Sequence, residues 1–318
     1  MVRPQLLSRP LKAFIKLAET LSYGDAAKAL EITQPALTQQ IKKLEEELGD
    51  VRLFDRGRGG VELTPVGEAF LAYAHRAKQE LEFGAEAVDA SRGLQRGTLR
   101  VGYSQGQLDL VSEALQALMD KEPGLTVSVN ETMAVRVGEL VLEGRLDVGL
   151  AYNWQASDKL EVRPLEPPVE LVLVVHKEHR LAGSPRLKDI RILEGEPFIL
   201  LQGGLAVRRT IDSYAASRNF RPRVVVETDD AQMIFSLVRE NKGVTLFPVT
   251  PYTALGPLVT VPLPSPATQT IAVLSRKGVD HPTVRLFIET IEEMFDPRGK
   301  RRAPVAVAKR KRAAPVRR

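Results

Sequence analysis

Residues 22–64 read SYGDAAKALEITQPALTQQIKKLEEELGDVRLFDRGRGGVELT, and this stretch decides how the first part of the chain folds. It predicts two short helices separated by a tight turn, followed by a basic, glycine-rich hairpin. Ser22 is a suitable N-cap for the first helix because Asp25 follows three residues later. Thr33 can cap the second helix, and Pro35 fits its first turn, where no intrahelical amide donor is needed.

The second helix has two different faces. Its apolar residues recur at helical spacing and are expected to pack inward: Leu37, Ile41, Leu44 and Leu48. A rotation of about 100° per residue places a polar set on the opposite face: Pro35, Thr38, Gln39 and Lys42. Gln can bridge two atoms of adenine, Thr can contact a base edge or a thymine methyl, and Lys can contact guanine or phosphate. This face is therefore suited to a DNA major groove.

The hairpin carries a cationic tip. Arg56 and Arg58 lie among Gly57, Gly59 and Gly60, and such a tip can enter a narrow minor groove or clamp phosphate. The alternative is an ordinary globular subdomain in which the Lys and Gln side chains are solvated surface. The loop weighs against that alternative because glycine and arginine contribute little to packing.

Residues 6–70 resemble the N-terminal domain of LysR-type transcriptional regulators. The resemblance rests on LSYGDAAKALEITQPALTQQIKKLEEELG, followed by LFDRGRGGVELTPVGEAFL, and the layout of the whole chain is similar apart from its start and tail. It implies that Arg56 faces the minor groove and that five residues face the major groove: Gln34, Pro35, Ala36, Thr38 and Gln39. Many members carry Arg where this chain has Gln39, so the recognised base sequence stays open.

The length and composition of the chain limit its number of domains and the classes of site it can carry. A chain of 318 residues suits two or three domains, and its hydrophobic fraction of 43% is ample for packed cores. The absence of cysteine excludes disulfides, thiolate metal sites and thiol nucleophiles. The first 25 residues hold no long apolar run, and no 18-residue apolar segment indicates a membrane span. These features predict a cytoplasmic protein.

The positive charge of the chain is concentrated at its end. Residues 298–318 contain ten Lys or Arg and no acid, so the remainder holds 35 basic and 40 acidic residues, a net charge of −5. A tail of this composition, over 297–318, is expected to be disordered. It is interpreted as a non-specific DNA tether, with a solubilising tail as the alternative. The family resemblance does not supply it.

A long helix is predicted after Thr64-Pro65, where a capping hydroxyl precedes proline. An apolar stripe recurs along it at steps of 4 and 3: Val66, Phe70, Tyr73, Ala77, Leu81, Gly84 and Val88. The residues between are polar, so the other faces of the helix are expected to be solvent-exposed: Glu68, Arg76, Lys78, Glu80 and Glu82. The stripe favours pairing with the same helix of a second chain, with packing onto its own chain as the alternative. A dimer would place two reading helices on a pseudo-palindromic promoter site, and the resemblance implies a tetramer.

From Gly97 onward, strands alternate with helices. The near-continuous apolar strands predict a parallel sheet covered on both faces. Two crossings, near 163–176 and 262–272, divide this part into two α/β lobes with a hinged cleft, as in periplasmic binding proteins and in the effector domain of the resembled family.

The predicted fold is therefore a winged helix-turn-helix domain, a linker helix, a two-lobed α/β effector domain resembling periplasmic binding proteins, and a basic tail. The expected bounds are 1–64, 65–92, 97–296 and 297–318. Within the effector domain, lobe one is expected at about 97–165 and 269–296, and lobe two at about 166–268.

Ligands in such sheets lie at the carboxyl ends of strands, beside helix N-termini that favour anions. This placement and the resemblance give the candidate effector contacts: Ser104, Gln105, Thr132, Gln202, Gly203, Gly204, Thr228 and Phe247. In the resembled family a Ser or Thr in the loop after the second strand often contacts the effector, and this chain has Ala134 at that position. The alternative is that Ser, Gln and Gly after a strand are ordinary turn residues. Trp154 is interpreted as packing, and Arg208 and Arg209 as partners of a neighbouring acid rather than of a carboxylate ligand.

No enzyme is predicted. His176 and His179 have a spacing found in metal sites, but they lie in an exposed turn without further ligands, and no catalytic, cofactor or metal site is assigned. The predicted function is sequence-specific transcriptional regulation, modulated by a small-molecule effector, with an organic anion as the candidate. RNA polymerase is a further candidate partner. The alternatives are a cytoplasmic solute-binding module and an architectural DNA-binding protein driven by the tail.

Overall fold

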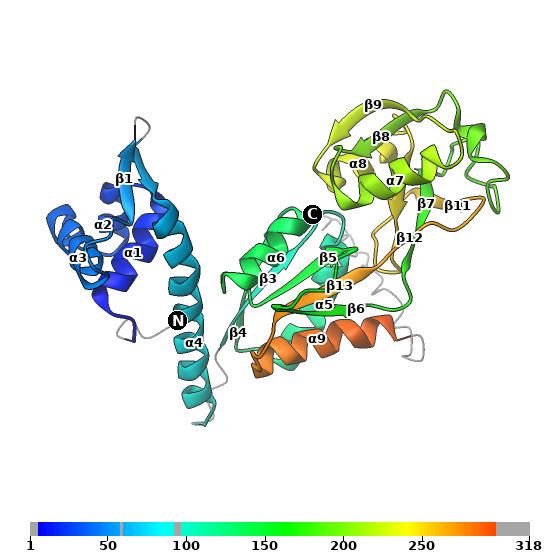
Figure 1. Cartoon of the computed structure of the whole chain (residues 1–318). Coiled ribbons are helices and arrows are strands. Elements are labelled where there is room, and N and C mark those ends of the chain that lie inside the picture. Colours follow the sequence, from blue (N-terminus) through cyan, green and yellow to red (C-terminus); the bar gives the residue numbers. More distant parts are fainter. Residues whose placement is uncertain (1–5, 58–59, 92–96, 297–318) are drawn as a thin grey trace, which may run out of the picture.

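The computed structural model describes residues 6–57, 60–91 and 97–296. Figure 1 shows three parts arranged in a row: a helical head on the left, the long helix α4 (Pro65–Ser91) beside it, and a two-lobed effector domain on the right. We refer to residues 6–63 as the reading head. The predicted tail at 297–318 lies outside the described residues.

The reading head consists of α1 (Arg9–Thr20), α2 (Tyr23–Ala29), α3 (Gln34–Glu47), β1 (Phe54–Gly57) and β2 (Gly60–Leu63). Both predicted caps are confirmed. The Ser22 hydroxyl accepts a hydrogen bond from the Asp25 amide at 3.2 Å, and Thr33 accepts one from the Ala36 amide at 3.3 Å. These bonds fix where α2 and α3 begin, because each satisfies an amide that has no partner inside the helix.

The core of the reading head is built around Phe14, whose ring lies 5.5 Å from that of Phe54 and 5.2 Å from that of Phe70. Three of the four leucine and isoleucine residues predicted to face inward from α3 are buried against it: Leu37, Ile41 and Leu44. The prediction was wrong for Leu48, which is 39% exposed. It lies at the C-cap, beyond the last helical residue, where the helical spacing no longer applies.

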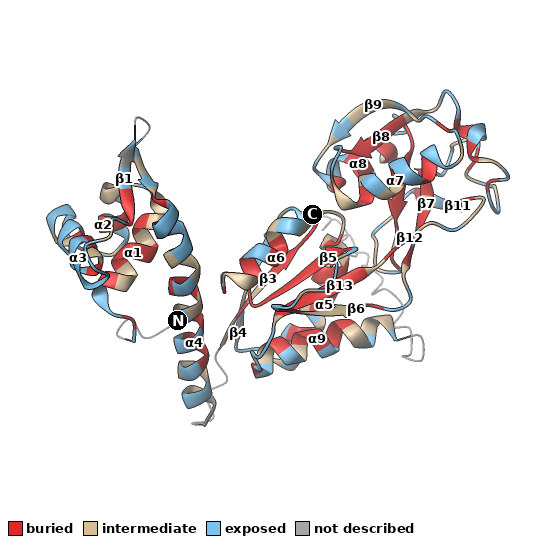
Figure 2. Cartoon of the chain, viewed as in Figure 1, coloured by how far each residue is buried: buried red, intermediate tan, exposed pale blue. Residues whose placement is uncertain are grey.

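Helix α4 carries the predicted apolar stripe on its outer face. The stripe members Val66, Tyr73, Leu81 and Val88 are 52%, 66%, 38% and 48% exposed, whereas Phe70 packs into the reading head. Figure 2 shows that much of α4 is solvent-exposed in the single chain. Apart from Phe70, the stripe is thus largely exposed in the single chain.

One residue of α4 that was predicted to be solvent-exposed is buried instead. Glu82 is 4% exposed because its carboxylate pairs with the Arg100 guanidinium of lobe one. The sequence pattern of α4 alone did not reveal this partner, which lies 18 residues away in a different element.

Lobe one contains β3 (Gly97–Tyr103), α5 (Leu108–Lys121), β4 (Leu125–Glu131), α6 (Ala134–Leu142), β5 (Val148–Tyr152), β6 (Leu160–Pro164), β13 (Ile271–Arg276) and α9 (Pro282–Phe295). Its sheet has the order β4-β3-β5-β13-β6. The first three strands run parallel, but β13 is antiparallel to both β5 and β6. Helices α5 and α9 pack together on this sheet.

Lobe two contains β7 (Val169–His176), a 3₁₀ turn (Ile190–Leu193), β8 (Pro197–Leu201), α7 (Ala206–Ala216), β9 (Arg223–Thr228), α8 (Ala231–Arg239), β10 (Thr245–Pro248), β11 (Leu258–Pro262) and β12 (Thr268–Gln269). Strands β8 and β9 are parallel, whereas β7 pairs antiparallel with β10, β11 and β12. The prediction of a parallel sheet was therefore only partly right. Strands that connect two lobes return through the sheet in the opposite direction, and an apolar run does not record direction.

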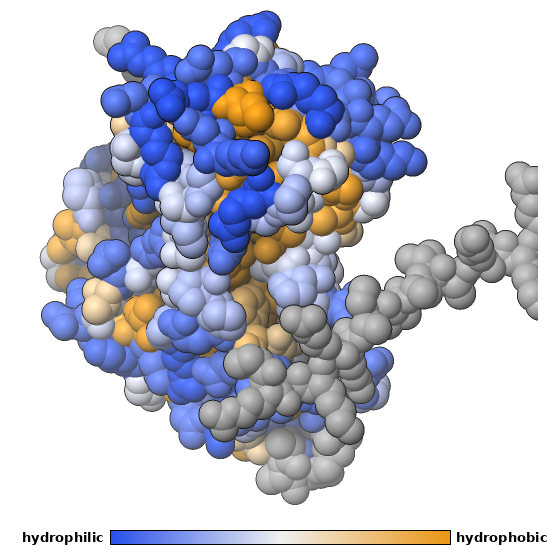
Figure 3. Space-filling model, turned by 90° about the vertical axis from the view of Figure 1, so that its right-hand side faces the viewer, coloured by the Kyte–Doolittle hydropathy of each residue, from blue (hydrophilic) through white to orange (hydrophobic). Residues whose placement is uncertain are grey.

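The chain passes from lobe one to lobe two between β6 and β7 and returns between β12 and β13. The cores of both lobes are rich in fully buried strand residues, including Leu150 and Phe198. Seen from the effector-domain side, the surface is mostly hydrophilic, with apolar side chains gathered in separate patches (Figure 3).

His75 of α4 lies in a polar cavity of about 140 Å³ between α1, α4 and lobe one. Burial, together with the nearby Arg145, lowers the pKa of His75 from 6.5 to about 4. His75 therefore becomes protonated near pH 6.5 in the unfolded chain, but only near pH 4 in the folded chain. Between these values the free energy of unfolding falls as the pH falls.

We expect the wild-type chain to lose about 2 kcal/mol more unfolding free energy between pH 7 and pH 5 than His75→Gln, which cannot titrate. Urea titrations at the two pH values measure this difference. Equal losses in the two proteins would show that His75 is not held neutral by its surroundings.

Candidate functional site

The outward face of α3 is the first candidate site. Gln34, Pro35, Thr38, Gln39 and Lys42 are exposed, and Ala36 is half-buried. The Thr38 hydroxyl donates to the Gln34 carbonyl at 3.0 Å, which holds that side chain against the helix. Lys42 lies 3.4 Å from Glu46 one turn later, an exposed ion pair that phosphate or a base can displace at small cost.

The position of α3 follows from the small residues of α2. Ala26 and Ala27 are buried between α2 and its neighbours, which allows the helices to pack closely. A Cβ at Gly24 would lie 3.1 Å from the side-chain amide nitrogen of Gln34, so the glycine lets that side chain lie close to α2. The result is a helix that buries Leu37 and Ile41 in the head and leaves its opposite face exposed.

The hairpin β1–β2 forms the predicted wing. The strands are antiparallel, and Gly57 pairs with Gly60 at the tip. Gly60 has a φ of 125°, a conformation that favours glycine. The backbone of Arg56 lies in β1 opposite Val61, whereas Arg58 lies outside the described residues.

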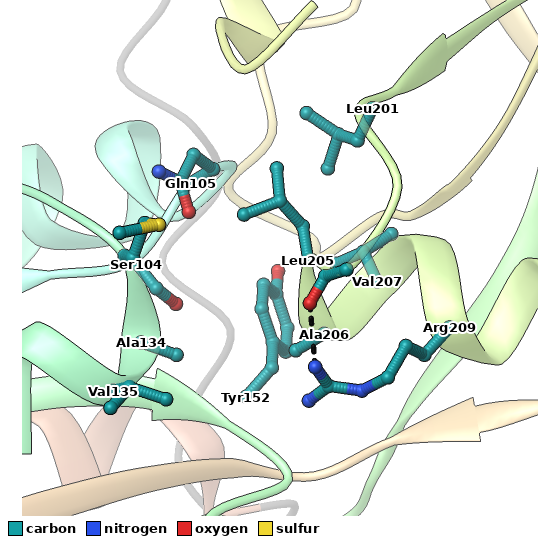
Figure 4. Close-up of a pocket in the computed structure, with 12 residues that line it drawn as sticks. Ser104, Gln105, Ala134, Val135, Tyr152, Leu201, Leu205, Ala206, Val207 and Arg209 are labelled. Atoms are coloured by element: carbon teal, nitrogen blue, oxygen red, sulfur yellow. Dashed lines mark hydrogen bonds between the residues drawn. The ribbon is translucent and has the colours of Figure 1, made fainter.

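The second candidate site is a cavity of about 70 Å³ between the two lobes. Ser104, Gln105, Met133, Ala134, Val135 and Tyr152 line it from lobe one, and Leu201, Gly204, Leu205, Ala206, Val207 and Arg209 line it from lobe two. Figure 4 shows Ser104 and Gln105 facing Leu205 across the cavity, with the Tyr152 hydroxyl pointing between the lobes. The walls are mainly apolar, with a few polar groups.

Two of these polar groups are buried hydroxyls without a hydrogen-bond partner. Ser104 and Tyr152 are each 3% exposed, and neither Ser104 Oγ nor the Tyr152 hydroxyl makes a hydrogen bond within the described part of the chain. Burial raises the pKa of Tyr152 above its ordinary value, so its hydroxyl keeps the proton it can donate. An unpaired buried hydroxyl costs free energy, and a ligand oxygen would satisfy it.

Helix N-termini add further donors at the cleft. Helices α6 and α7 begin at Ala134 and Ala206, both of which line the cavity. Their N-cap residues, Met133 and Leu205, make no side-chain cap hydrogen bond. Backbone amides left unpaired at a helix start attract an anion or a carbonyl oxygen.

Charged groups beside the cavity have opposite signs. Arg209 lines it and donates to the Gly204 carbonyl at 2.6 Å (Figure 4), which leaves guanidinium donors for a ligand. Arg208 instead pairs with Asp212 at 2.8 Å and with Glu227 at 2.6 Å. At the end of β4, burial raises the pKa of Glu131, and the charges of Asp230 and Asp229 raise it further.

Three predicted effector residues line the cavity: Ser104, Gln105 and Gly204. The other five do not line it. The Thr132 amide donates to the Tyr103 carbonyl, and the Thr228 hydroxyl accepts from the Asp230 amide. Gln202 and Gly203 are exposed. Phe247 is buried, and its ring fills the space where Gly106 lacks a side chain.

Sequence reasoning missed Tyr152 and most of the apolar wall. Tyr152 ends the strand β5, so the strand-end argument that selected Ser104 could have found it. Met133, Val135 and Leu205 carry no polar group, and nothing in the sequence separates them from core residues. Trp154 packs on Gly138, where an added side chain would meet its ring, as predicted for a packing residue.

Within residues 6–57, 60–91 and 97–296, no group of three or more His, Asp or Glu side chains is placed to hold a metal ion. His179 lies 3.3 Å from Glu196 in an ion-pair arrangement. Among the helices of the described residues, none combines the length and apolarity needed to cross a membrane.

Comparison with known proteins matches both parts of the chain to one family. The model described as "Bacterial regulatory helix-turn-helix protein, lysR family" matches residues 8–68. The model described as "LysR substrate binding domain" matches residues 92–296.

Individual relatives agree with these matches. The HTH-type transcriptional regulator AlsR of Bacillus subtilis is 30% identical over 243 residues, covering 76% of this chain and 80% of AlsR. The regulator ShiR of Corynebacterium glutamicum is 33% identical over 246 residues, covering 75% and 81%.

The fold is shared with solved structures. A full-length OxyR variant from Pseudomonas aeruginosa has a TM-score of 0.69 at 22% identity, covering 89% of this chain and 93% of its own. Full-length CbnR in complex with its target DNA has a TM-score of 0.64 at 24% identity, covering 89% and 98%. The chain belongs to the LysR family: it is a DNA-binding transcriptional regulator with an effector-binding domain.

Proposed function

We propose that the outward face of α3 reads the major groove through Gln34, Pro35, Ala36, Thr38, Gln39 and Lys42, while Arg56 and Arg58 contact the minor groove. The observation that supports this most is the exposure of one polar face of α3, which carries Gln34, Pro35, Thr38, Gln39 and Lys42. A helix of this length fits a major groove, and a cationic tip suits the narrow groove beside it.

The functional unit is a dimer formed through α4, and two dimers make a tetramer. The exposed stripe supports the dimer, because an apolar row on one face of a 27-residue helix gains by pairing with the same row of a second copy. In a two-fold symmetric pair, two reading heads face two half-sites of a pseudo-palindrome.

Leu81→Glu is expected to weaken this dimer. Each dimer contains two copies of Leu81, and burying part of a leucine contributes on the order of 1 kcal/mol, so the dissociation constant should rise at least about tenfold. Sedimentation over a concentration series measures it. Met119→Glu on α5 is the matched control, since Met119 is 54% exposed and lies off α4. A dimer through α4 would be contradicted if both variants raised the dissociation constant equally, or if neither variant changed it.

The effector is a small organic anion bound in the cavity between the lobes. Uncapped starts of α6 and α7, the free hydroxyls of Ser104 and Tyr152, and Arg209 all favour an oxyanion there. The apolar walls favour a short hydrocarbon body. Glu131 ends β4 two residues before the cavity residue Met133, and Asp229 and Asp230 act on it electrostatically. These carboxylates disfavour a second negative charge on the effector, so a monocarboxylate fits better than a dicarboxylate.

A series of monocarboxylates with two to seven carbons, each paired with its primary amide, tests this assignment. The full chain is expected to gain thermal stability with at least one acid and less with its amide, and Ser104→Ala is expected to reduce the gain. Stabilisation by amides and acids alike would contradict an anion site.

The basic tail supplies sequence-independent affinity for DNA, and RNA polymerase is a partner of the assembled regulator at its promoter. Ten basic residues without an acid support the first statement. We expect truncation at Pro297 to lower affinity most at low salt, because fewer counterions are then released on binding. Binding titrations at several salt concentrations measure the slope. A changed site preference, or an unchanged slope, would contradict the tether.

A further inference from the structure

Lobe one places a carboxylate at the edge of the effector cavity. Glu131 is the last residue of β4 and is in register with Tyr103 of β3, which directly precedes the cavity residue Ser104. Met133, two residues after Glu131, also lines the cavity. The Tyr103 hydroxyl donates to Glu131 Oε2 at 3.3 Å. This bond holds an exposed carboxylate at the strand end that leads into the cavity.

Lobe two places two more carboxylates at the matching strand end. Thr228 is the last residue of β9 and pairs with Leu201 of β8, which lines the cavity. Asp229 and Asp230 follow Thr228 directly. Asp230 Oδ1 caps α8 by accepting from the Gln232 amide at 2.7 Å, whereas Asp230 Oδ2 accepts no hydrogen bond within the described part of the chain. One carboxylate oxygen of Asp230 is therefore available to a ligand.

These carboxylates have no cation of their own. Across residues 6–57, 60–91 and 97–296, no Lys, Arg or His side chain forms an ion pair with Glu131, Asp229 or Asp230. Burial raises the pKa of Glu131, and the charges of Asp230 and Asp229 raise it further. The carboxylates of the two lobes therefore repel one another, and a cationic group beside Glu131 would relieve that repulsion.

An ammonium group suits this position better than a metal ion. A metal ion requires several ligands at close range, and no group of three or more carboxylates or imidazoles within the described residues is placed to supply them. An ammonium needs only one carboxylate in direct contact, and the remaining negative charges attract it from a greater distance. The acidic edge therefore fits an amine.

The cavity next to this edge has the opposite preference. The buried hydroxyls of Ser104 and Tyr152 have no partner within the described residues, and both groups line the cavity (Figure 4). Arg209 and the start of α7 at Ala206 also favour an anion there. Because Ser104 follows the strand residue that pairs with Glu131, the two preferences occur on neighbouring residues.

We propose that the effector is an aminocarboxylate, whose carboxylate occupies the cavity and whose ammonium group contacts Glu131 within the field of Asp229 and Asp230. This inference rests on the anion site proposed above and adds the second charged group of the ligand. A zwitterion satisfies both subsites and brings no further negative charge toward the acidic edge. Glu131 is then a specificity-determining residue that selects amino acids over plain carboxylic acids of the same length.

Ligands that differ only in their amino group test this proposal. The straight-chain acids from acetate to hexanoate are each compared with the amino acids of the same length that carry the amine at the α or the ω carbon. Butylamine supplies an ammonium without a carboxylate. Dissociation constants for the purified full-length protein are measured by titration calorimetry. At least one aminocarboxylate is expected to bind about tenfold more tightly than its plain acid, as a charge-assisted hydrogen bond allows.

Two variants assign this preference to the acidic edge. Glu131→Gln keeps an acceptor for the Tyr103 hydroxyl but removes the charge. It should weaken binding of the aminocarboxylate about tenfold and should strengthen binding of the plain acid, which no longer meets a like charge. Asp230→Asn retains a residue that caps α8 well and should shift both constants in the same directions by less. The control Glu240→Gln, at the other end of α8, should change neither.

Shifts in opposite directions separate recognition from damage to the fold, because a partly unfolded lobe would bind both ligands more weakly. The proposal is overturned if plain acids bind as tightly as every aminocarboxylate, or if Glu131→Gln weakens both kinds of ligand equally. In either case the anion site of the proposed function stands. If no carboxylate of either kind binds, or if butylamine binds as tightly as the aminocarboxylates, the anion site fails and this proposal fails with it.

Discussion

Replacing Thr38 and Gln39 by alanine is expected to abolish most of the preference for the operator over unrelated DNA. Both side chains project from the exposed face of α3, and their removal leaves the helix fold intact because the buried face is untouched. A bidentate base contact, which Gln39 can make, contributes about 1–3 kcal/mol of discrimination, so the double substitution should lower the specificity ratio by about tenfold to a hundredfold. Competition binding with operator and random duplexes measures the ratio.

Two controls separate reading from general attraction to DNA. Gln116→Ala removes an exposed glutamine in lobe one and should leave the ratio unchanged. Arg56→Ala should weaken binding to both duplexes to a similar extent, because a minor-groove or phosphate contact carries little sequence information. If the specificity ratio survived the loss of both Thr38 and Gln39, the assignment of the reading face to α3 would be wrong.

Arg100→Leu is expected to be strongly destabilising, because Arg100 joins lobe one to helix α4 through the buried carboxylates of Asp147 and Glu82. It leaves the buried carboxylate of Asp147 without its cation and leaves Glu82 with only Lys78, 4.0 Å away. Breaking a buried ion pair in this way typically costs about 3–5 kcal/mol, because the remaining charge is desolvated and uncompensated. Urea unfolding followed by the fluorescence of Trp154, which lies in lobe one, measures the loss.

The matched control is Arg191→Leu, which removes an arginine from a fully exposed ion pair with Asp189 in lobe two. It should leave the unfolding midpoint of lobe one unchanged, since exposed pairs are screened by water and salt. A similar loss in the two variants would mean that the ion pairs of Arg100 contribute no more to the free energy of unfolding than a surface pair.

The reading head could be predicted in detail because its signals are local. Ser22, Thr33 and Thr64 each cap a helix a few residues away, and the spacing of Leu37, Ile41 and Leu44 identifies the buried face without knowledge of any partner. The apolar stripe of α4 was equally readable. For Leu48 the same spacing failed, because the helix ends one residue earlier.

The features that the sequence did not reveal depend on contacts between distant segments. Glu82 is indistinguishable from a solvated glutamate until β3 places Arg100 against it. The antiparallel direction of β13 follows from the return of the chain between lobes, not from its apolar composition. In the cleft, strand-end reasoning found Ser104 but not Leu205, whose role in the wall arises only when the two lobes face each other.

Sequencing the genomic fragments that the purified full-length protein retains at physiological salt tests the central claim most directly. If two reading heads bind DNA through α3, the enriched fragments are expected to share a motif with two-fold symmetry. The genes beside those fragments would then narrow the choice of effector. Retention of fragments without a common motif would contradict sequence-specific reading and assign DNA binding to the basic tail. Retention of no fragments would contradict DNA reading altogether.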